Sequence, residues 1–525
     1  MNYENNDDLQ YDSCISRGIC SINPKTSALQ EMLLIYLKVA AFYAKKVYDY
    51  GKLNNDPKLV ILNTISMMVT NPNFSENDYI LLKLEFKKII PELEQIYYNK
   101  YDETNEKIEY FKSILEQDKE NDIIKSIQLG ERELKERVNH IKPDILNMYK
   151  ILFILAKSLC INILNLESLD MYLEKGYKTI LMILTSIDLA YRDASDIKSL
   201  VEYVVQVDNF MMRKLRNVQE KRYGYQRESE VSYSTEPGKA VLVVGSNIRE
   251  LDIILESLKD SEIDVYTHDE MMVAHTFPYF SQYHNLKGQY GHGLSNCLID
   301  FATFPGPIIL TRHSLFNVEH LYRGLLFTTD NICSKGVIPI KNKDFSEVIK
   351  SAEESKGFKT GKKCESVNIG FSTPNLLRNL FDSIQDYSRV IILGQGTISM
   401  EQQAYFEKIK SMAPKDVLIL SLTGIQEQEN VINLNACFDT LAMARVAERI
   451  KEMINIPMTL FFPECDNHSI SQMIYLKEFD DLDIYVGKCS SMFFNPNLIQ
   501  TLENVFGIKQ QTTVKNDLSA IFDKN

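Results

Sequence analysis

Short apolar runs alternate with amphipathic stretches from residue 239 onward, and each run ends in a cluster of polar residues. The first run turns at Gly245, and the second leads into Glu270. Continuous apolar runs of this length are typical of strands in a parallel sheet that helices cover on both faces. The pattern predicts strands near 240–244, 263–267, 307–311, 324–328, 389–393, 415–422, 458–462 and 483–486, with a helix at 438–454.

The first 217 residues have a different pattern, in which apolar residues recur three and four positions apart. This spacing predicts amphipathic helices that pack as a bundle. The helices are expected near 29–51, 57–70, 76–99, 103–118, 119–138, 143–164, 167–193 and 196–217. Residues 101–140 carry many Glu and Lys residues at helical spacing, so we expect a solvated helical hairpin there.

The two patterns divide the chain into a helical part and an α/β part. We expect a helical-bundle domain over 1–217, a linker over 218–238, a Rossmann-like α/β domain over 239–370 and a second Rossmann-like α/β domain over 371–525. Repeated strand–turn–helix segments form doubly wound sheets whose strand ends point side chains into a crevice. A binding site is therefore expected at the strand ends.

Composition narrows the class of protein. The 525 residues are 45% hydrophobic and 25% charged, with a formal net charge of -13, as in an acidic soluble protein. Nucleic acid is not expected as a partner, because phosphate binding needs a basic surface. The chain shows no signal peptide and no apolar run of the roughly 20 residues that span a bilayer, so no membrane association is expected.

The nine cysteines are scattered over the chain, and their number is odd. A disulfide framework would have an even number at dense, regular spacings. This usage instead indicates reduced thiols and a cytoplasmic location.

Several sequence blocks occur in the order of one known family. They are Asn23 to Gln30 after Cys14 and Cys20, Val265 to Met271, Ala274 to Pro278, Tyr290-Gly291, Phe304 to Ile308, and Asn497 to Ile508. Over essentially its whole length the chain resembles the hybrid cluster proteins, also called prismane proteins or hydroxylamine reductases, which are related to the nickel carbon monoxide dehydrogenases. The resemblance implies a helical domain followed by two Rossmann-like domains.

The resemblance also implies a hybrid iron–sulfur–oxygen cluster held by one His, two Glu and four Cys. Glu270 and Cys437 occupy two of these ligand positions unchanged, and Asp466 replaces the second Glu. The other positions carry Ser246 in place of His, and Ser314, Gly396 and Gly424 in place of Cys. We expect Glu270, Ser314, Gly396, Gly424, Cys437 and Asp466 to converge in one cavity between the two α/β domains.

The N-terminal cluster of the family is also incomplete here. Only Cys14 and Cys20 remain of its four cysteines, and two thiolates cannot hold a four-thiolate cluster. Glycine has no ligating side chain, and serine is a poor replacement for thiolate or imidazole.

We therefore expect a member that has kept the scaffold and lost its clusters and reductase activity. It would bind no cofactor and act as a structural or binding homologue. The sequence leaves open which protein it binds and whether it is a monomer or a homodimer.

A second hypothesis keeps the chain as an oxidoreductase of the hydroxylamine or nitric oxide reductase type, with an altered iron–sulfur centre or a single iron or zinc. Glu270, Cys437 and Asp466 would hold the metal, with His313 and His468 as helpers. Against it, free cysteine is among the most buried residue types, so Cys437 has a simple packing interpretation.

A third hypothesis is an anion or nucleotide site at a strand–helix turn. Gly394-x-Gly396 and Gly245 each lie after a predicted strand, where backbone N–H groups at a helix start bind phosphate. The turn lacks the third glycine of a dinucleotide fingerprint and an identifiable acidic ribose partner. The signal is weak.

Overall fold

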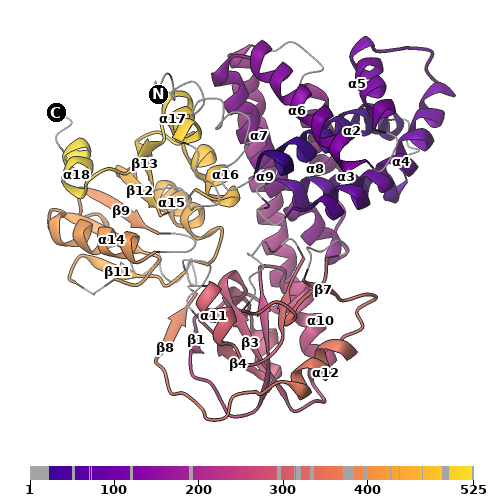
Figure 1. The fold of residues 1–525 in the computed structure, drawn as a ribbon. Helices are drawn as coiled ribbons and strands as arrows, with labels where there is room; N and C mark the ends of the chain where they lie inside the picture. The colour runs from indigo at the N-terminus through magenta and orange to yellow at the C-terminus, as the bar shows by residue number, and fades with distance from the viewer. Residues whose placement is uncertain are drawn as a thin grey trace, which may run out of the picture. The chain divides into compact units, whose positions relative to one another are not determined.

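A computed structural model describes residues 23–49, 54–69, 71, 74–118, 122–187, 193–291, 297–312, 314, 321–330, 336–370, 384–394, 399–425, 428–436, 438–463, 465–487 and 496–522. The chain forms two compact units. One comprises Met1–Met211 with Cys489–Val505, and the other comprises Met212–Lys488 with Phe506–Asn525. The first is helical and the second contains parallel sheets (Figure 1). The protein thus has the mixed helical and α/β architecture that its hydrophobic pattern predicts.

The helical unit consists of helices with short connections (Figure 1). They are α2 (Pro24–Asp49), α3 (Asn55–Met68), α4 (Glu76–Tyr98), α5 (Glu106–Gln117), α6 (Ile123–His140), α7 (Pro143–Ser168), α8 (Glu174–Ser186), α17 (Pro496–Phe506) and the first part of α9 (Ala194–Tyr223). Capping side chains explain several starts. Ser75 forms a capping box with Asp78, and Asn105 and Asp122 accept hydrogen bonds from the first turns of α5 and α6.

The boundary between α7 and α8 differs from the predicted one. The helix expected over 167–193 is interrupted near its start, because Asp170 adopts a left-handed conformation with a φ of 62°. The backbone N–H groups of Asp170 and Met171 donate to the carbonyl oxygens of Glu167 and Leu166, both at 3.0 Å. This arrangement satisfies the last carbonyls of α7 and ends the helix.

Helix α7 is the core helix of the helical unit. Of the helices in the described ranges, it alone is long and apolar enough to cross a membrane, and 83% of its most apolar stretch is buried inside the protein. The sequence analysis missed this apolar run. A helix that is apolar all round is buried in the core of a large protein or in a membrane. Helix α7 is buried within its own chain, so it is a helix of the protein core.

A buried charge cluster joins four helices of the same unit: α2, α4, α5 and α6. Asp118, at the end of α5, forms a 2.8 Å ion pair with Lys83 of α4, and both side chains are 1% exposed. The same carboxylate accepts hydrogen bonds from Tyr36 at 3.0 Å, from Tyr79 at 2.6 Å and from Ser126 of α6. Buried charges need this many partners, because each ion loses its hydration on folding.

The first sheet of the α/β unit contains six parallel strands. They are β2 (Lys239–Val244), β3 (Ile263–His268), β4 (Leu286–Gln289), β5 (Ile308–Leu310), β6 (Leu326–Thr328) and β7 (Ile338–Pro339), in the spatial order β4-β3-β2-β5-β6-β7. Between them lie α10 (Ile248–Leu258), the 3-10 helices η1 (Asp269–Thr276) and η2 (Pro278–Gln282), and α11 (Cys297–Thr303); α12 (Ser346–Glu354) follows β7.

The second sheet repeats this arrangement. Its strands are β9 (Arg389–Leu393), β10 (Val417–Ser421), β11 (Val431–Asn433), β12 (Met458–Phe462), β13 (Leu482–Val486) and β14 (Lys509–Gln510), in the order β11-β10-β9-β12-β13-β14. All are parallel to their neighbours. The helices of this part are α14 (Met400–Met412), α15 (Ala442–Met453), α16 (Asn467–Leu476) and α18 (Val514–Phe522).

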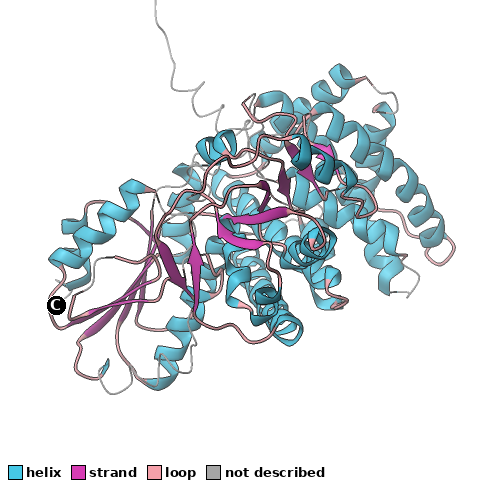
Figure 2. Ribbon diagram, turned by 90° about the horizontal axis from the view of Figure 1, so that it is seen from below, coloured by secondary structure: helices cyan, strands magenta, loops and turns pink. Residues whose placement is uncertain are grey.

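Numbered within each sheet, the strands of both follow the Rossmann order 3-2-1-4-5-6. Figure 2 shows the strands and the helices around them from a second direction. The chain changes direction across the sheet between β2 and β5 in the first, and between β9 and β12 in the second. Ligands of such folds bind at the carboxyl ends of the strands at this switch point. The topology therefore marks two adjoining strand ends in each sheet.

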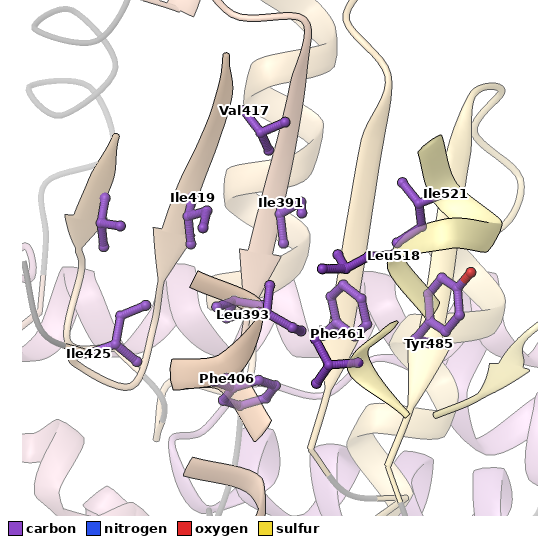
Figure 3. Packing of buried hydrophobic residues seen from close by; sticks show 13 residues of the cluster. Ile391, Leu393, Phe406, Val417, Ile419, Ile425, Phe461, Tyr485, Leu518 and Ile521 are labelled. Carbon is purple, nitrogen blue, oxygen red and sulfur yellow. The ribbon is translucent and has the colours of Figure 1, made fainter. Parts of the chain in front are cut away.

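The core of the second sheet shows why these strands form. Every residue of β10 and β12 is buried, and side chains alternate between the two faces of the sheet. On one face Ile391, Ile419 and Phe461 pack with Phe406 of α14 and Leu518 of α18 (Figure 3). Helices on both faces explain the continuous apolar runs in the sequence.

Two regions differ from the predicted elements. The expected linker over 218–238 begins as the last part of α9, which ends where Gly224 adopts a φ of 90°. It continues into β1 (Ser229–Ser232), which pairs antiparallel with β8 (Ser366–Ile369). The pattern also missed the short strands β4, β7, β11 and β14, because edge strands of two to four residues carry little local signal.

Candidate functional site

The candidate residues follow strands at the carboxyl edges of the two sheets. Ser246 follows β2, Glu270 follows β3 and Ser314 follows β5 in the first sheet. In the second sheet, Gly424 follows β10 and Asp466 follows β12. Ser246 and Ser314 lie at the switch point of the first sheet, and Asp466 lies at that of the second. The predicted positions thus coincide with the binding edges that the topology marks.

Glu270 is the centre of the group that the structure brings together. Its carboxyl group is near those of Asp269 and Asp466, and Ser246 forms a side-chain hydrogen bond with it. Burial, and then the charges of Asp269 and Asp466, raise the pKa of Glu270 to about 8, while the Ser246 hydrogen bond opposes this shift. Although the residue keeps some exposed surface, its carboxyl group is enclosed, so burial dominates.

The group around Glu270 contains residues from both α/β sheets. Glu270 and Ser246 belong to the first sheet, and Asp466 belongs to the second. They are nearly 200 positions apart in the sequence, yet the carboxyl group of Glu270 is close enough to Asp466 for the charge to shift its pKa. Of the positions expected to converge, Glu270 and Asp466 are therefore near each other.

Asp466 also has a structural role. It is the N-cap of α16, where its carboxylate accepts hydrogen bonds from the Ser469 N–H at 2.7 Å and the Ser469 hydroxyl at 2.9 Å. His468 lies in the first turn of the same helix and is partly buried. Both oxygens of Asp466 are thus engaged in capping, a role that needs no metal.

Ser314 is turned toward the backbone of the first sheet. Its hydroxyl lies 3.2 Å from that of Thr311 and 3.4 Å from the Val244 carbonyl oxygen, to which Thr311 also donates. Gly245, with a φ of 116°, makes room for this arrangement, because a Cβ there would lie 2.0 Å from the Ser314 hydroxyl. The serine fills space at the switch point and is hydrogen-bonded locally.

Gly424 occupies a similarly closed position. It has a φ of 69°, and a Cβ would lie 2.7 Å from Oδ1 of Asn435. Its carbonyl oxygen accepts a hydrogen bond from Gln403 at 3.3 Å. A side chain reaching into the site from this position would require Asn435 to move.

Several predicted site residues lie outside the described residues, and their positions are not discussed. They are Cys14, Cys20, His313, Gly396 and Cys437.

Two free cysteines close to the candidate residues are among the described ones. Cys465 is buried, and Cys297 is partly buried at the start of α11. Burial, with Asp269 and Asp300 nearby, raises the pKa of the Cys297 thiol to about 11. The thiol form therefore predominates at neutral pH, whereas metal binding and nucleophilic attack need the thiolate.

Sequence reasoning missed part of the acidic surroundings of Glu270. Asp269 adopts a left-handed conformation with a φ of 57° and is buried directly beside it. His268 is fully buried and lies 3.0 Å from the carboxylate of Asp300 on α11. Adjacent acids after a strand were visible in the sequence, but the partner of His268 is 32 residues away and gave no local signal.

The described residues do not fit the iron–sulfur cluster that the resemblance implies. Such clusters are held by thiolates, and the strand ends at Ser246, Ser314 and Gly424 offer two hydroxyls and no side chain. The hydroxyl of Ser314 is hydrogen-bonded locally, and Asp466 caps a helix. Across the described ranges, no three His, Cys, Asp or Glu side chains are grouped so that they could hold a metal ion.

The turns considered for phosphate are also occupied by protein groups. The N–H of Gly394 donates to the carbonyl oxygen of Phe461 in the sheet. After Gly245, the start of α10 is capped by Asn247, and Glu250 lies in its first turn. The Glu250 carboxylate accepts hydrogen bonds from the Arg312 N–H at 2.7 Å and the Thr329 hydroxyl at 2.5 Å, and its negative charge in the first turn disfavours an anion at this helix start.

Comparisons with known proteins agree with the fold. The hydroxylamine reductase of Thermodesulfovibrio yellowstonii is 24% identical over 97% of this chain and 97% of its own length. The hydroxylamine reductases of Acidiphilium cryptum and Clostridium novyi are 23% and 24% identical, each over 96% of this chain and over 94% and 96% of their own lengths. Residues 10–519 match the Prismane/CO dehydrogenase family. The chain therefore belongs to the Prismane/CO dehydrogenase family.

Proposed function

We propose that this protein is a non-catalytic member of its family, which keeps the scaffold of a hydroxylamine reductase without its iron–sulfur clusters or reductase activity. It would act as a structural or binding homologue. The proposal rests on both the residues that are changed and the contacts that the replacements make.

The observation that carries the proposal is the chemistry at the strand ends. Ser246, Glu270 and Asp466 are close together, as a family site requires, but they contribute oxygen atoms to one another and to the protein. Ser314 hydrogen-bonds beside Val244, and Gly424 has no side chain. A group of hard oxygen donors does not replace the thiolates that hold iron–sulfur clusters and set their potential.

Anaerobic purification followed by iron, sulfide and zinc analysis tests the proposal. The same preparation is assayed for hydroxylamine reduction with reduced methyl viologen, and the Clostridium novyi hydroxylamine reductase, purified in parallel, is the positive control. We expect no stoichiometric iron or sulfide and no turnover above that of free iron at the same concentration. Several irons per chain with matching sulfide, together with iron-dependent turnover, would contradict the proposal.

A second candidate is an altered centre with one iron or zinc, and the convergence of Glu270 and Asp466 favours it. Cys437, His313 and His468 would complete the ligand set. One equivalent of metal that is lost in both the Glu270→Gln and Asp466→Asn variants would support this candidate over the first. Asp466→Asn keeps a side chain that can cap α16, so metal loss there would report on ligation and not on folding.

A further inference from the structure

A hollow in the surface of the helical unit is separate from the strand-end site. It has a volume of about 200 Å³ and lies among α2, α8 and α9. Residues that line it include Lys45, Tyr48, Lys178, Leu181, Met182 and Tyr203. We propose that this hollow binds a small organic anion with a flat apolar body, of the class of aromatic carboxylates.

The charge of the lining favours an anion. Lys45 and Lys178 both line the hollow, and no carboxylate does. The amine of Lys45 donates to the hydroxyl of Thr185 at 3.4 Å, a neutral partner that leaves the charge of the amine available to an anion. Lys178 pairs with Glu174 at 3.2 Å, but these side chains are 53% and 74% exposed. An ion pair this exposed is weak, so Lys178 can pair with the carboxylate of a ligand in place of Glu174.

The two amines contact different residues around the hollow. Lys178 lies over the ring of Tyr48, with its amine 5.2 Å from the ring centre. Lys45, one turn earlier on α2, contacts Thr185, which is seven residues after Lys178 on α8 and therefore about 10 Å along that helix. A hollow of about 200 Å³ can hold a single ring that carries one carboxylate.

The walls provide the apolar part of the site. Leu181 is 1% exposed and closes the floor, and Met182 is partly buried beside it. Tyr203 is 44% exposed, so a ring stacked on it would cover apolar surface that now faces solvent. Two aromatic side chains beside two amines match a ligand with a ring and one negative charge.

The size and charge of the hollow exclude other ligand classes. A volume of about 200 Å³ is below the range of about 300–1,000 Å³ for drug-sized ligands, so a nucleotide does not fit. A cation would be repelled by both lysines. The protein as a whole carries a net charge of -13, so the positive lining is a local feature.

The full-length protein, labelled with ¹³C at its methionine methyl groups, allows a test by NMR. Benzoate is titrated, and the Met182 signal is assigned from the Met182→Leu variant. Benzyl alcohol has the same ring without the charge, benzylammonium reverses the charge, and acetate keeps the charge without the ring. We expect benzoate to shift the Met182 signal with saturation, and the three control molecules to shift it much less.

Two lysine variants and a matched control identify the charged groups. Lys45→Gln and Lys178→Gln should each weaken benzoate binding about fivefold, as expected for loss of one exposed ion pair. Lys88→Gln removes an exposed lysine on α4, 68% exposed, and should leave the affinity unchanged. Circular dichroism verifies that the variants are folded.

Three results would overturn the inference. One is the absence of a saturable Met182 shift at millimolar benzoate, and another is an equal shift with benzyl alcohol, which would make the hollow a non-specific apolar surface. The third is an affinity for benzoate that is the same in the Lys45→Gln, Lys178→Gln and Lys88→Gln variants. The inference does not depend on the proposed function, because none of the strand-end residues takes part in it.

Discussion

Replacing Glu270 with Gln tests the site directly, because the two proposals for it predict opposite results. Gln keeps the shape of the side chain and an oxygen that can accept the Ser246 hydrogen bond, but it removes the negative charge. In a metal-free site, that charge is buried beside Asp269 and Asp466, so its removal should stabilise the protein. In a metal site, the same change removes a ligand and should destabilise the metal-bound protein.

The pH dependence follows from the pKa of about 8, against an ordinary value of 4.5. Between these values the folded protein holds a proton that the unfolded chain releases, so the free energy of unfolding falls as pH rises. The stabilising contribution of the protonated group is fully present below about pH 4.5 and is lost as pH rises through about 8. The slope is at most about 1.4 kcal/mol per pH unit. Over the two pH units between pH 5 and pH 7 we therefore expect a loss of about 1 to 3 kcal/mol.

Hydrogen exchange measured by mass spectrometry gives the local free energy of opening for β3 and η1. This readout is preferable to a whole-chain melt, because two compact units need not unfold together. The gain of Glu270→Gln over the wild type should be near zero at pH 4.5 and should grow toward pH 8. Glu262→Gln makes the same chemical change at an exposed position just before β3 and is the matched control.

Two results would refute this reasoning. A gain that is the same at every pH would show that the carboxylate is not the source of the effect. A loss of stability with release of a bound metal would show that Glu270 is a ligand, and would support the altered-centre candidate.

The remaining predictions concern the two units separately. Asp118→Asn should lower the free energy of unfolding of the helical unit by about 3 to 5 kcal/mol in urea denaturation, because Lys83 is left buried without its counter-charge. Adding Lys83→Met should recover part of this loss. No recovery would show that the ion pair is not the cause. Gly245→Ala should destabilise the first sheet by a few kcal/mol, through its φ of 116° and contact with the Ser314 hydroxyl. Gly324→Ala has a φ of 91° and open space around its Cβ, so an equal loss there would assign the effect to backbone strain alone.

The local pattern of the sequence was sufficient for the main elements. The strand runs at Ala240 and Val390 and the helical spacing before residue 217 predicted most helices and the strands β2, β3, β5, β6, β9, β10, β12 and β13, because burial on one or both faces leaves a periodic signal. The same pattern placed Ser246, Glu270 and Asp466 after strands. Parallel pairing then required these residues to lie at the carboxyl edges of their sheets.

Tertiary contacts decided the features that have no local signal. The edge strands β11 and β14 are three and two residues long and form only because β10 and β13 offer a hydrogen-bonding edge. The end of α7 depends on the left-handed Asp170, a conformation that the surrounding apolar pattern did not indicate.

The character of the candidate site was also decided by the tertiary structure. The sequence shows that Glu270 and Asp466 are acids, but only the fold brings them close enough to raise the pKa of Glu270. The sequence likewise shows serine at position 314, whereas the contacts with Thr311 and Val244 show that its hydroxyl is hydrogen-bonded to the protein. Residue identity follows from the sequence, but the partners of a buried polar group come from distant segments, and those partners determine what the group can bind.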